Sequence, residues 1–171
     1  MILSCQGISK SFGEKVILED ASFHIEEREK AALIGNNGAG KTTLFRLMLD
    51  LLKADEGNVK MFPNKQQAEN EDIPSEINPS VSEDWKMLTG AYIDNSFLID
   101  FLTAEEYFEF IGKVSGLSKE QTEERLKDFE HFMNGEVLGQ KKYIRDFSAG
   151  NKQKVGIIAA LLNRPQLVVL D

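Results

Sequence analysis

One eight-residue stretch combines glycines, a lysine and a threonine at a spacing suited to holding a chain of phosphates. In order, its residues are Gly35, Asn36, Asn37, Gly38, Ala39, Gly40, Lys41 and Thr42, which match the pattern G-x-x-x-x-G-K-[ST]. The glycines permit positive φ angles, so that backbone N–H groups can turn towards one anion, and a helix starting at Lys41 adds its partial positive charge. Lys41 would reach the β- and γ-phosphates, Thr42 would offer its hydroxyl to Mg²⁺, and Thr43 would donate to the α-phosphate. The stretch predicts a nucleoside triphosphate site; the alternative is a glycine turn before a surface lysine.

The chain on either side of this loop has the order of elements that such a loop requires. Residues 31–34 are apolar without alternation, as in a buried strand of a parallel sheet. Residues 41–52 contain good helix formers with an apolar stripe at helical spacing. That stripe consists of Leu44, Leu47, Met48 and Leu51. Strand, glycine-rich turn and helix therefore follow one another, which strengthens the phosphate-binding interpretation.

A carboxylate near the other end of the chain is a candidate for holding the magnesium ion. Residues 167–170 are apolar and predict a buried strand, and Asp171 follows them directly. Ligands of α/β proteins bind at the carboxyl ends of strands, and an acid in this position holds Mg²⁺ in nucleotide sites. Aspartate is also common in turns after strands. Together with the loop, the sequence favours the magnesium role.

Four further runs predict strands. Residues 2–12 and 16–26 form two of them, and the second alternates apolar and polar side chains, which indicates a sheet with one face towards water. Residues 58–62 and 88–93 form the other two. Between them, residues 63–84 contain three prolines and six acidic residues against one lysine, which predicts an exposed insertion or loop.

Three helices are expected in the second half of the chain. The first two start at capping boxes, in which a hydroxyl residue is followed three positions later by Glu or Gln. These boxes are Thr103 with Glu106 and Ser118 with Gln121. The second helix carries an apolar pattern up to Met133, and the third begins near Ser148 and stops before Pro165, which cannot continue a helix. The fold class is therefore α/β, with helices inserted between strands of the core.

Composition excludes several classes of protein. With 171 residues, 42% of them apolar and 28% charged, the chain is an ordinary globular one. No apolar run approaches the roughly 20 residues of a membrane-spanning helix, and the first residues lack the layout of a signal peptide, so we expect a cytoplasmic protein. The net charge of −8 argues against general nucleic-acid binding. The single cysteine, Cys5, is expected to be a small buried side chain rather than a reactive or metal-binding thiol.

A second motif connects the chain to a known family. Residues 147–154 read Phe-Ser-Ala-Gly-Asn-Lys-Gln-Lys and lie about twenty residues before the strand that ends at Asp171. They resemble the Leu-Ser-Gly-Gly-Gln signature of the ATP-binding cassette (ABC) ATPases, with Ser148 and Gly150 retained. A serine cap and free N–H groups at a helix start can bind an anion, although an ordinary capped helix has the same features. Together with the loop and Asp171, the chain resembles an ABC nucleotide-binding domain over essentially its whole length.

The resemblance implies a fold more detailed than α/β. We expect a P-loop NTPase (RecA-like) core with an N-terminal antiparallel β subdomain and an inserted α-helical subdomain, ending directly after the Walker B aspartate with the C-terminal strands missing. Residues 1–171 would be one incomplete ABC ATP-binding domain. Within it, 1–93 would be the β subdomain and P-loop core, 94–150 the helical subdomain with the signature, and 151–171 the signature helix and Walker B strand. The family places a later strand between the two nucleotide-motif strands, so independent stability is in question.

The resemblance also assigns roles to residues outside the loop. Phe12 stands where the family has an aromatic residue that stacks on adenine, the alternative being a core phenylalanine. Asn95 falls near the Q-loop glutamine that touches Mg²⁺, with Asp94 as a rival. Ser148 and Gly150 would face the γ-phosphate of ATP held by a second cassette, in a head-to-tail dimer that requires ATP. The implied cofactors are ATP and Mg²⁺, with Lys41 and Asp171 as the catalytic residues.

Two catalytic groups of the family have no counterpart in the sequence. They are the glutamate that normally follows the Walker B aspartate and the later switch histidine. His24 and His131 do not stand in the right order to replace that histidine, and we expect both to face solvent. No general base for the attacking water can be named, so the chain is expected to bind ATP without efficient turnover.

Three functions remain open at this point. Residues 102–107 and 147–154 resemble ATPase subunits of bacterial exporters, which would place the chain on the inner face of the cell membrane through a transmembrane permease. Residues 16–43 are more similar to the ABC-F proteins, which act on ribosomes but usually carry a basic linker that this acidic chain lacks. The third possibility is a fragment that only binds ATP. The exporter interpretation leads, and it involves no nucleic acid.

Overall fold

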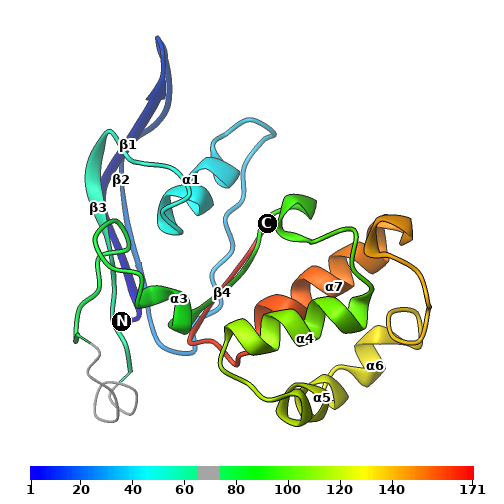
Figure 1. Ribbon diagram of the computed structural model, residues 1–171. Coiled ribbons are helices and arrows are strands. Elements are labelled where there is room, and N and C mark those ends of the chain that lie inside the picture. The colour runs from blue at the N-terminus through cyan, green and yellow to red at the C-terminus, as the bar shows by residue number, and fades with distance from the viewer. Residues whose placement is uncertain (65–73) are drawn as a thin grey trace. The chain divides into compact units, whose positions relative to one another are not determined.

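The computed structural model describes residues 1–64 and 74–171 (Figure 1). The chain separates into two compact units. The first comprises Met1–Leu88 together with Asp171, and the second comprises Thr89–Leu170. Among the described residues, no helix combines the length and the apolar character needed to cross a membrane.

The first unit contains a three-stranded antiparallel sheet. Strand β1 (Leu3–Phe12) lies between β2 (Lys15–Ile25) and β3 (Glu56–Met61), as Figure 1 shows. β1 and β2 form a hairpin whose last pair is Phe12 and Lys15. The predicted strands are confirmed, and the outer face of β2 contacts water as expected. The buried apolar side chains of β1 and β3 are Leu3, Cys5, Ile8, Val59 and Met61.

Helix α1 (Lys41–Met48) follows the glycine-rich loop, but it is shorter than predicted. Three of the four residues of its predicted apolar stripe are buried, namely Leu44, Leu47 and Met48. The helix stops there because Asp50 adopts a left-handed conformation with φ of 51°. Leu51 therefore lies beyond the helix with an exposed side chain, and its predicted place on the apolar face is wrong.

The strand predicted at residues 31–34 is wrong. The segment belongs to no strand, and the side chains of Leu33 and Ile34 are exposed, the latter to 91%. A strand forms only where a neighbour accepts and donates its ladder of hydrogen bonds, and none of the described strands pairs with this segment. Apolar character alone therefore does not place these residues in the core.

The acidic segment predicted as an exposed loop is partly buried where it is described. Part of it, residues 65–73, lies outside the described residues. Ile77 is 1% exposed and exchanges two backbone hydrogen bonds of 2.8 Å with Met61 at the end of β3. The short helix α3 (Trp85–Leu88) then buries Trp85 and Leu88. The prediction of an exposed loop is therefore wrong at Ile77, because its side chain completes the core beside β3.

The second unit pairs two parallel strands, β4 (Thr89–Tyr92) and β5 (Leu167–Leu170). Both strands were expected from the sequence. In β5, however, Leu167 and Val169 are buried whereas Val168 and Leu170 are exposed. The prediction of a strand buried on both faces is wrong, because only one face of this pair is covered within the unit.

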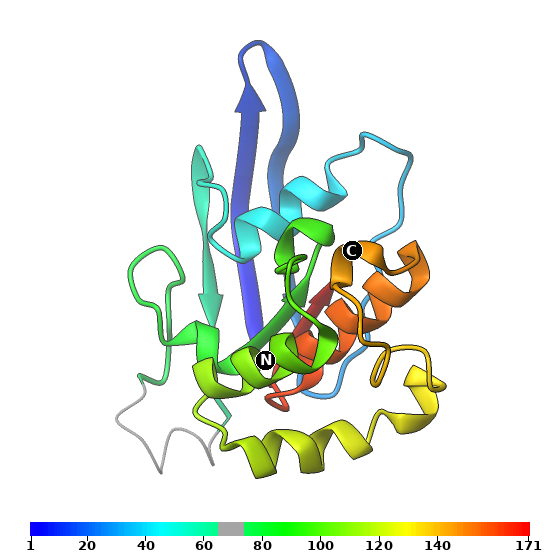
Figure 2. The ribbon, with the colours of Figure 1, turned by 45° about the vertical axis from the view of Figure 1, so that its right-hand side comes forward.

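The other regular elements of the second unit are helices (Figure 2). Its helical elements are η1 (Asn95–Phe97), α4 (Ala104–Val114), α5 (Lys119–Lys127), α6 (Glu130–Met133), η2 (Ile144–Asp146) and α7 (Ala149–Leu161). α4 contacts both α5 and α7. Phe108, Val137, Ile144, Val155 and Ile158 are completely buried in the shared core.

The predicted capping boxes are both present. Thr103 N–H donates to Glu106 Oε2 at 2.8 Å, and Glu106 N–H donates back to the threonine hydroxyl at 3.3 Å. Ser118 and Gln121 make the same reciprocal pair at 2.8 and 3.2 Å. The second predicted helix is nevertheless divided into α5 and α6, since the backbone of Phe129 leaves helical geometry between them.

Helix α7 packs against β4 at two glycines. A Cβ atom added to Gly156 would lie 2.2 Å from Cε2 of the Tyr92 ring, and one added to Gly90 would lie 1.7 Å from the carbonyl oxygen of Ala160. Separations this short are far inside van der Waals contact. The absence of side chains at these two positions therefore sets how closely the helix approaches the strand.

We expect Gly156→Ala to lower the free energy of unfolding by roughly 1–3 kcal/mol, because the new methyl group overpacks the core against Tyr92. Urea denaturation followed by circular dichroism measures the change. Gly150→Ala is the matched control in the same helix, since nothing lies within 4 Å of its added Cβ. Equal midpoints for the two variants would contradict the close packing.

Candidate functional site

The glycine-rich loop adopts the backbone that its sequence predicts. Gly38 and Gly40 have φ angles of 83° and 92°, which are left-handed and favour glycine. Gly40 is also the N-cap of α1. A Cβ at Gly40 would lie 2.8 Å from Cγ2 of Ile17 and 3.2 Å from its carbonyl oxygen. Glycine is thus required at position 40 both by the backbone angle and by the contact with β2.

Lys41 folds back over the loop that precedes it. Its Nζ donates to the carbonyl oxygens of Gly35 at 2.8 Å and Asn36 at 3.0 Å. An ammonium group has three N–H donors, so two hold the side chain in place and one is left for a ligand. The positive charge is therefore fixed beside the start of α1, where the helix dipole also favours an anion.

Two oxygen-bearing side chains meet at the same place. The hydroxyl of Thr42, in the first turn of α1, donates a hydrogen bond to Oδ2 of Asp171. The two residues are 129 positions apart in the sequence, so this is a long-range contact within the first unit. Hydroxyl and carboxylate oxygens are ligands that Mg²⁺ accepts.

These groups line one pocket of about 530 Å³. Its lining residues are Lys15, Ile17, Asn37, Gly38, Gly40, Lys41, Thr42, Thr43 and Asp171. The volume lies in the range of small-molecule sites. Sequence reasoning missed Lys15 and Ile17, because no motif marks them: they reach the pocket only through the fold of β2 beside the loop.

Phe12 ends β1 and is not among the lining residues of the pocket. Its side chain is 52% exposed, so the alternative of a core phenylalanine is wrong. Its hairpin partner Lys15 does line the pocket, which puts the aromatic ring at the same end of the hairpin. The ammonium of Lys10 lies 5.5 Å from the centroid of this ring.

In the second unit, Asn95 and its rival Asp94 have different partners. Asn95 is exposed, and its Oδ1 accepts a 3.0 Å hydrogen bond from the hydroxyl of Tyr92. Burial, followed by the charge of Asp94, raises the pKa of Tyr92 and keeps that hydroxyl protonated. Asp94 caps η1, with its carboxylate accepting the N–H of Ser96 at 2.8 Å.

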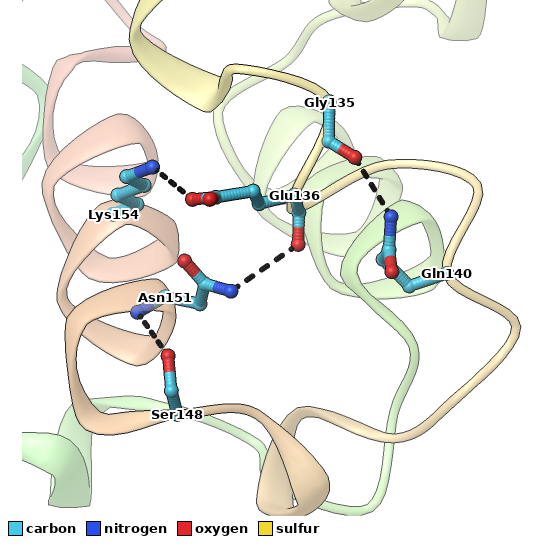
Figure 3. Close-up of polar contacts among 6 residues, drawn as sticks. All are labelled: Gly135, Glu136, Gln140, Ser148, Asn151 and Lys154. Carbon is cyan, nitrogen blue, oxygen red and sulfur yellow. Dashed lines mark hydrogen bonds and ion pairs between the residues drawn. The ribbon is translucent and has the colours of Figure 1, made fainter.

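Ser148 caps the start of α7 (Figure 3), and both it and Gly150 in the first turn are exposed. The serine hydroxyl accepts the backbone N–H of Asn151 at 3.2 Å, which is the N-cap expected from the sequence. The amide of Asn151 donates to the carbonyl of Glu136 at 3.5 Å, and Lys154 binds the Glu136 carboxylate at 2.5 Å. The hydrogen bond from Lys154, together with its charge, lowers the pKa of Glu136. The sequence contains no signal for this ion pair.

The burial of Cys5 and the exposure of the two histidines agree with expectation. The thiol of Cys5 is buried, and this burial raises its pKa to about 12, so the thiolate does not form near neutral pH. His24 and His131 are both exposed, as predicted. Within residues 1–64 and 74–171, no cluster of three His, Cys, Asp or Glu side chains is arranged to hold a metal ion.

Comparison with known proteins places this architecture in a family. The model of a family described as ABC transporter matches residues 18–171. The chain belongs to this family. It is an ABC nucleotide-binding domain, and its α/β fold of the P-loop NTPase type is confirmed by solved structures. One of them, described as the ATP binding subunit of an ABC transporter, is 27% identical with a TM-score of 0.79, covering all of this chain and 66% of the other.

Curated relatives of this ABC domain are longer than the chain. The ABC transporter ATP-binding protein YxlF of Bacillus subtilis (strain 168) is 30% identical over 170 residues, which are 99% of this chain and 52% of the relative. The bacitracin transport ATP-binding protein BcrA of Enterococcus faecalis is 27% identical, over 99% of this chain and 50% of the relative. The chain thus spans about half the length of these relatives.

We expect Gly40→Ala to destabilise the first unit of this ABC domain more than Gly38→Ala. Both substitutions force alanine into a left-handed conformation at a cost of about 1 kcal/mol, but only the first adds a clash with Ile17. Urea denaturation of the two variants measures the difference, with Gly38→Ala as the control for the cost of the left-handed φ angle. Equal losses would show that the contact with β2 is unimportant.

Proposed function

We propose that this chain is the ATP-binding part of a bacterial ABC exporter that couples ATP binding and hydrolysis to a separate membrane subunit. The observation that carries the proposal is the pocket at the start of α1. There, a left-handed glycine loop, the ammonium of Lys41 and the oxygens of Thr42 and Asp171 come together. This set of groups suits a magnesium-bound triphosphate better than any ligand without phosphate.

Each group in the pocket has a distinct part in binding. The N–H groups of the loop and the first turn of α1 point positive ends of dipoles at the phosphates. Lys41 supplies a full charge at a fixed position, since two loop carbonyls already hold its Nζ. Lys15 adds a second positive side chain to the lining. Together they favour a polyanion over a neutral ligand.

The residues present also fit a magnesium ion. Thr42 and Asp171 are in direct contact, and Mg²⁺ is usually held in nucleotide sites by one or two protein oxygens together with water and phosphate oxygens. These two side chains would hold the ion, which would neutralise phosphate charge during transfer. The magnesium role of Asn95, which belongs to the second unit, stays a prediction from the sequence.

Similarity to proteins named for transport and for resistance supports the transport part of the proposal. BcrA is named for bacitracin transport, and LnrL of Bacillus subtilis (strain 168), 28% identical over 99% of this chain and 50% of its own length, for linearmycin resistance. Similarity to proteins with such names favours an exporter role for this chain over a ribosomal role. A transmembrane permease would then hold this chain on the cytoplasmic face of the membrane.

The start of α7 would contribute to a second nucleotide site. Ser148 and Gly150 are exposed, and the space around Gly150 is open, so another molecule can approach the free N–H groups of this turn. We propose that these groups contact the γ-phosphate of ATP held by a second cassette. ATP would then join two cassettes head to tail.

We expect Lys41→Ala to weaken Mg-ATP binding roughly 100-fold or more, because it removes a charge-assisted hydrogen bond to phosphate. Isothermal titration calorimetry on the 171-residue chain measures the affinity. Lys86→Ala is the control, since this lysine pairs with Glu83 and is not among the residues that line the pocket. An unchanged affinity in Lys41→Ala would refute the proposed phosphate site.

We expect Ser148→Arg to leave the ATP affinity of the monomer intact and to prevent dimer formation by ATP, because a long side chain would fill the approach to α7. Light scattering with and without Mg-ATP measures the mass. Ser115→Arg, at the C-terminal end of α4, adds the same side chain elsewhere in the second unit. An ATP-dependent dimer that persists in Ser148→Arg would exclude the proposed role of this serine.

A further inference from the structure

The ring of Phe12 has a cation on one of its faces. Its side chain is 52% exposed at the end of β1, and the Nζ of Lys10 lies 5.5 Å from the ring centroid. This distance is within the range of cation–π attraction. Residues two apart on a strand point to the same side, which explains why the lysine can cover the ring.

Asp55 fixes the lysine in this position. One carboxylate oxygen accepts from Nζ of Lys10 at 2.6 Å, and the other accepts the backbone N–H of Ser11 at 2.7 Å. The backbone N–H of Asp55 donates in turn to the carbonyl of Ser9 at 2.9 Å. The acid is therefore attached to β1 on both sides of Lys10, whose side chain is only 13% exposed.

The same bonds hold Asp55 in its charged form. The hydrogen bond from Lys10 and then that from Ser11 keep the pKa of Asp55 below its ordinary value. An ionised acid retains the ammonium, and the ammonium in turn attracts the ring. The three side chains thus form a series in which the charged pair limits the motion of Phe12.

We propose that Lys10 and Asp55 are positioning residues that hold Phe12 as a one-sided stacking platform for the nucleotide base. This inference depends on the proposed function, since it assumes that a nucleotide binds at the neighbouring pocket. The ammonium occupies one face of the ring, so the base stacks on the other. Because the ring is held before the ligand arrives, less conformational freedom is lost on binding.

A purely structural role for the same ion pair makes a different prediction. Asp55 also joins β1 to the segment before β3 through the backbone of Ser9 and Ser11. If Asp55 had only this structural role, loss of the lysine would disturb the sheet and weaken the binding of both kinds of ligand equally, with or without a base. The two roles are separated by comparing a ligand that has a base with one that has only phosphates.

The experiment compares Mg-ATP with Mg-tripolyphosphate by isothermal titration calorimetry on the 171-residue chain. Lys10→Met keeps the length of the side chain and removes its charge. We expect it to weaken ATP binding roughly two- to fivefold, the range of an exposed cation–π contact, and to leave tripolyphosphate binding unchanged. Phe12→Ala, which removes the platform, is expected to lower ATP affinity roughly fivefold or more and also to spare tripolyphosphate.

Two further variants control for folding and for general charge effects. Asp55→Asn keeps an oxygen that can accept from Ser11 and releases the lysine, so it is expected to reproduce Lys10→Met. Lys60 lies on strand β3 of the same sheet and forms an ion pair of 2.9 Å with Glu76. Lys60→Met removes this pair and is expected to change the affinity for neither ATP nor tripolyphosphate. Circular dichroism checks that each variant is folded.

The outcomes distinguish this inference from the proposed function. Equal weakening of both ligands in Lys10→Met and Asp55→Asn, or no change with ATP, overturns the positioning role while the phosphate site stands. If the unmodified chain binds ATP no more tightly than tripolyphosphate, the stacking platform is refuted and the phosphate site is kept. If it binds neither ligand, the proposed function fails and the inference with it.

Discussion

The contact between Gly40 and Ile17 is the constraint on which the candidate site depends. Because no Cβ stands at Gly40, the loop can lie against β2, and the left-handed backbone there leads into α1, whose first residues line the pocket. The positions of Lys41 and Thr42 follow from that start. The chemistry of the loop therefore depends on the neighbouring antiparallel sheet as much as on the loop's own sequence.

The sequence predicts well those features that depend only on neighbouring residues. The capping boxes at Thr103 and Ser118 were predictable because a hydroxyl and a carboxamide or carboxylate three residues later reach one another in any helix start. The glycine loop was predictable for the same reason, since positive φ angles require particular residue types. Family resemblance, by contrast, supplied the fold of the core.

The wrong predictions concern segments whose structure depends on contacts with distant parts of the chain. Residues 31–34 are apolar enough for a buried strand, yet strand formation depends on a hydrogen-bonded neighbour that local sequence cannot reveal. Ile77 was expected in an exposed acidic loop and is buried against Met61 instead. Lys15 and the pair of Glu136 with Lys154 were missed because only the folded chain brings them to their sites. Sequence patterns therefore predicted the groups of the proposed phosphate site but not the residues that surround them.

Tyr92 joins two of the candidate residues of the second unit. Gly156 allows α7 to press directly on one side of its ring, and its hydroxyl holds the amide of Asn95. The same helix begins at Ser148. With no space left between the helix and the ring, the position of α7 fixes that of the Tyr92 ring, and the ring hydroxyl in turn holds the side chain of Asn95.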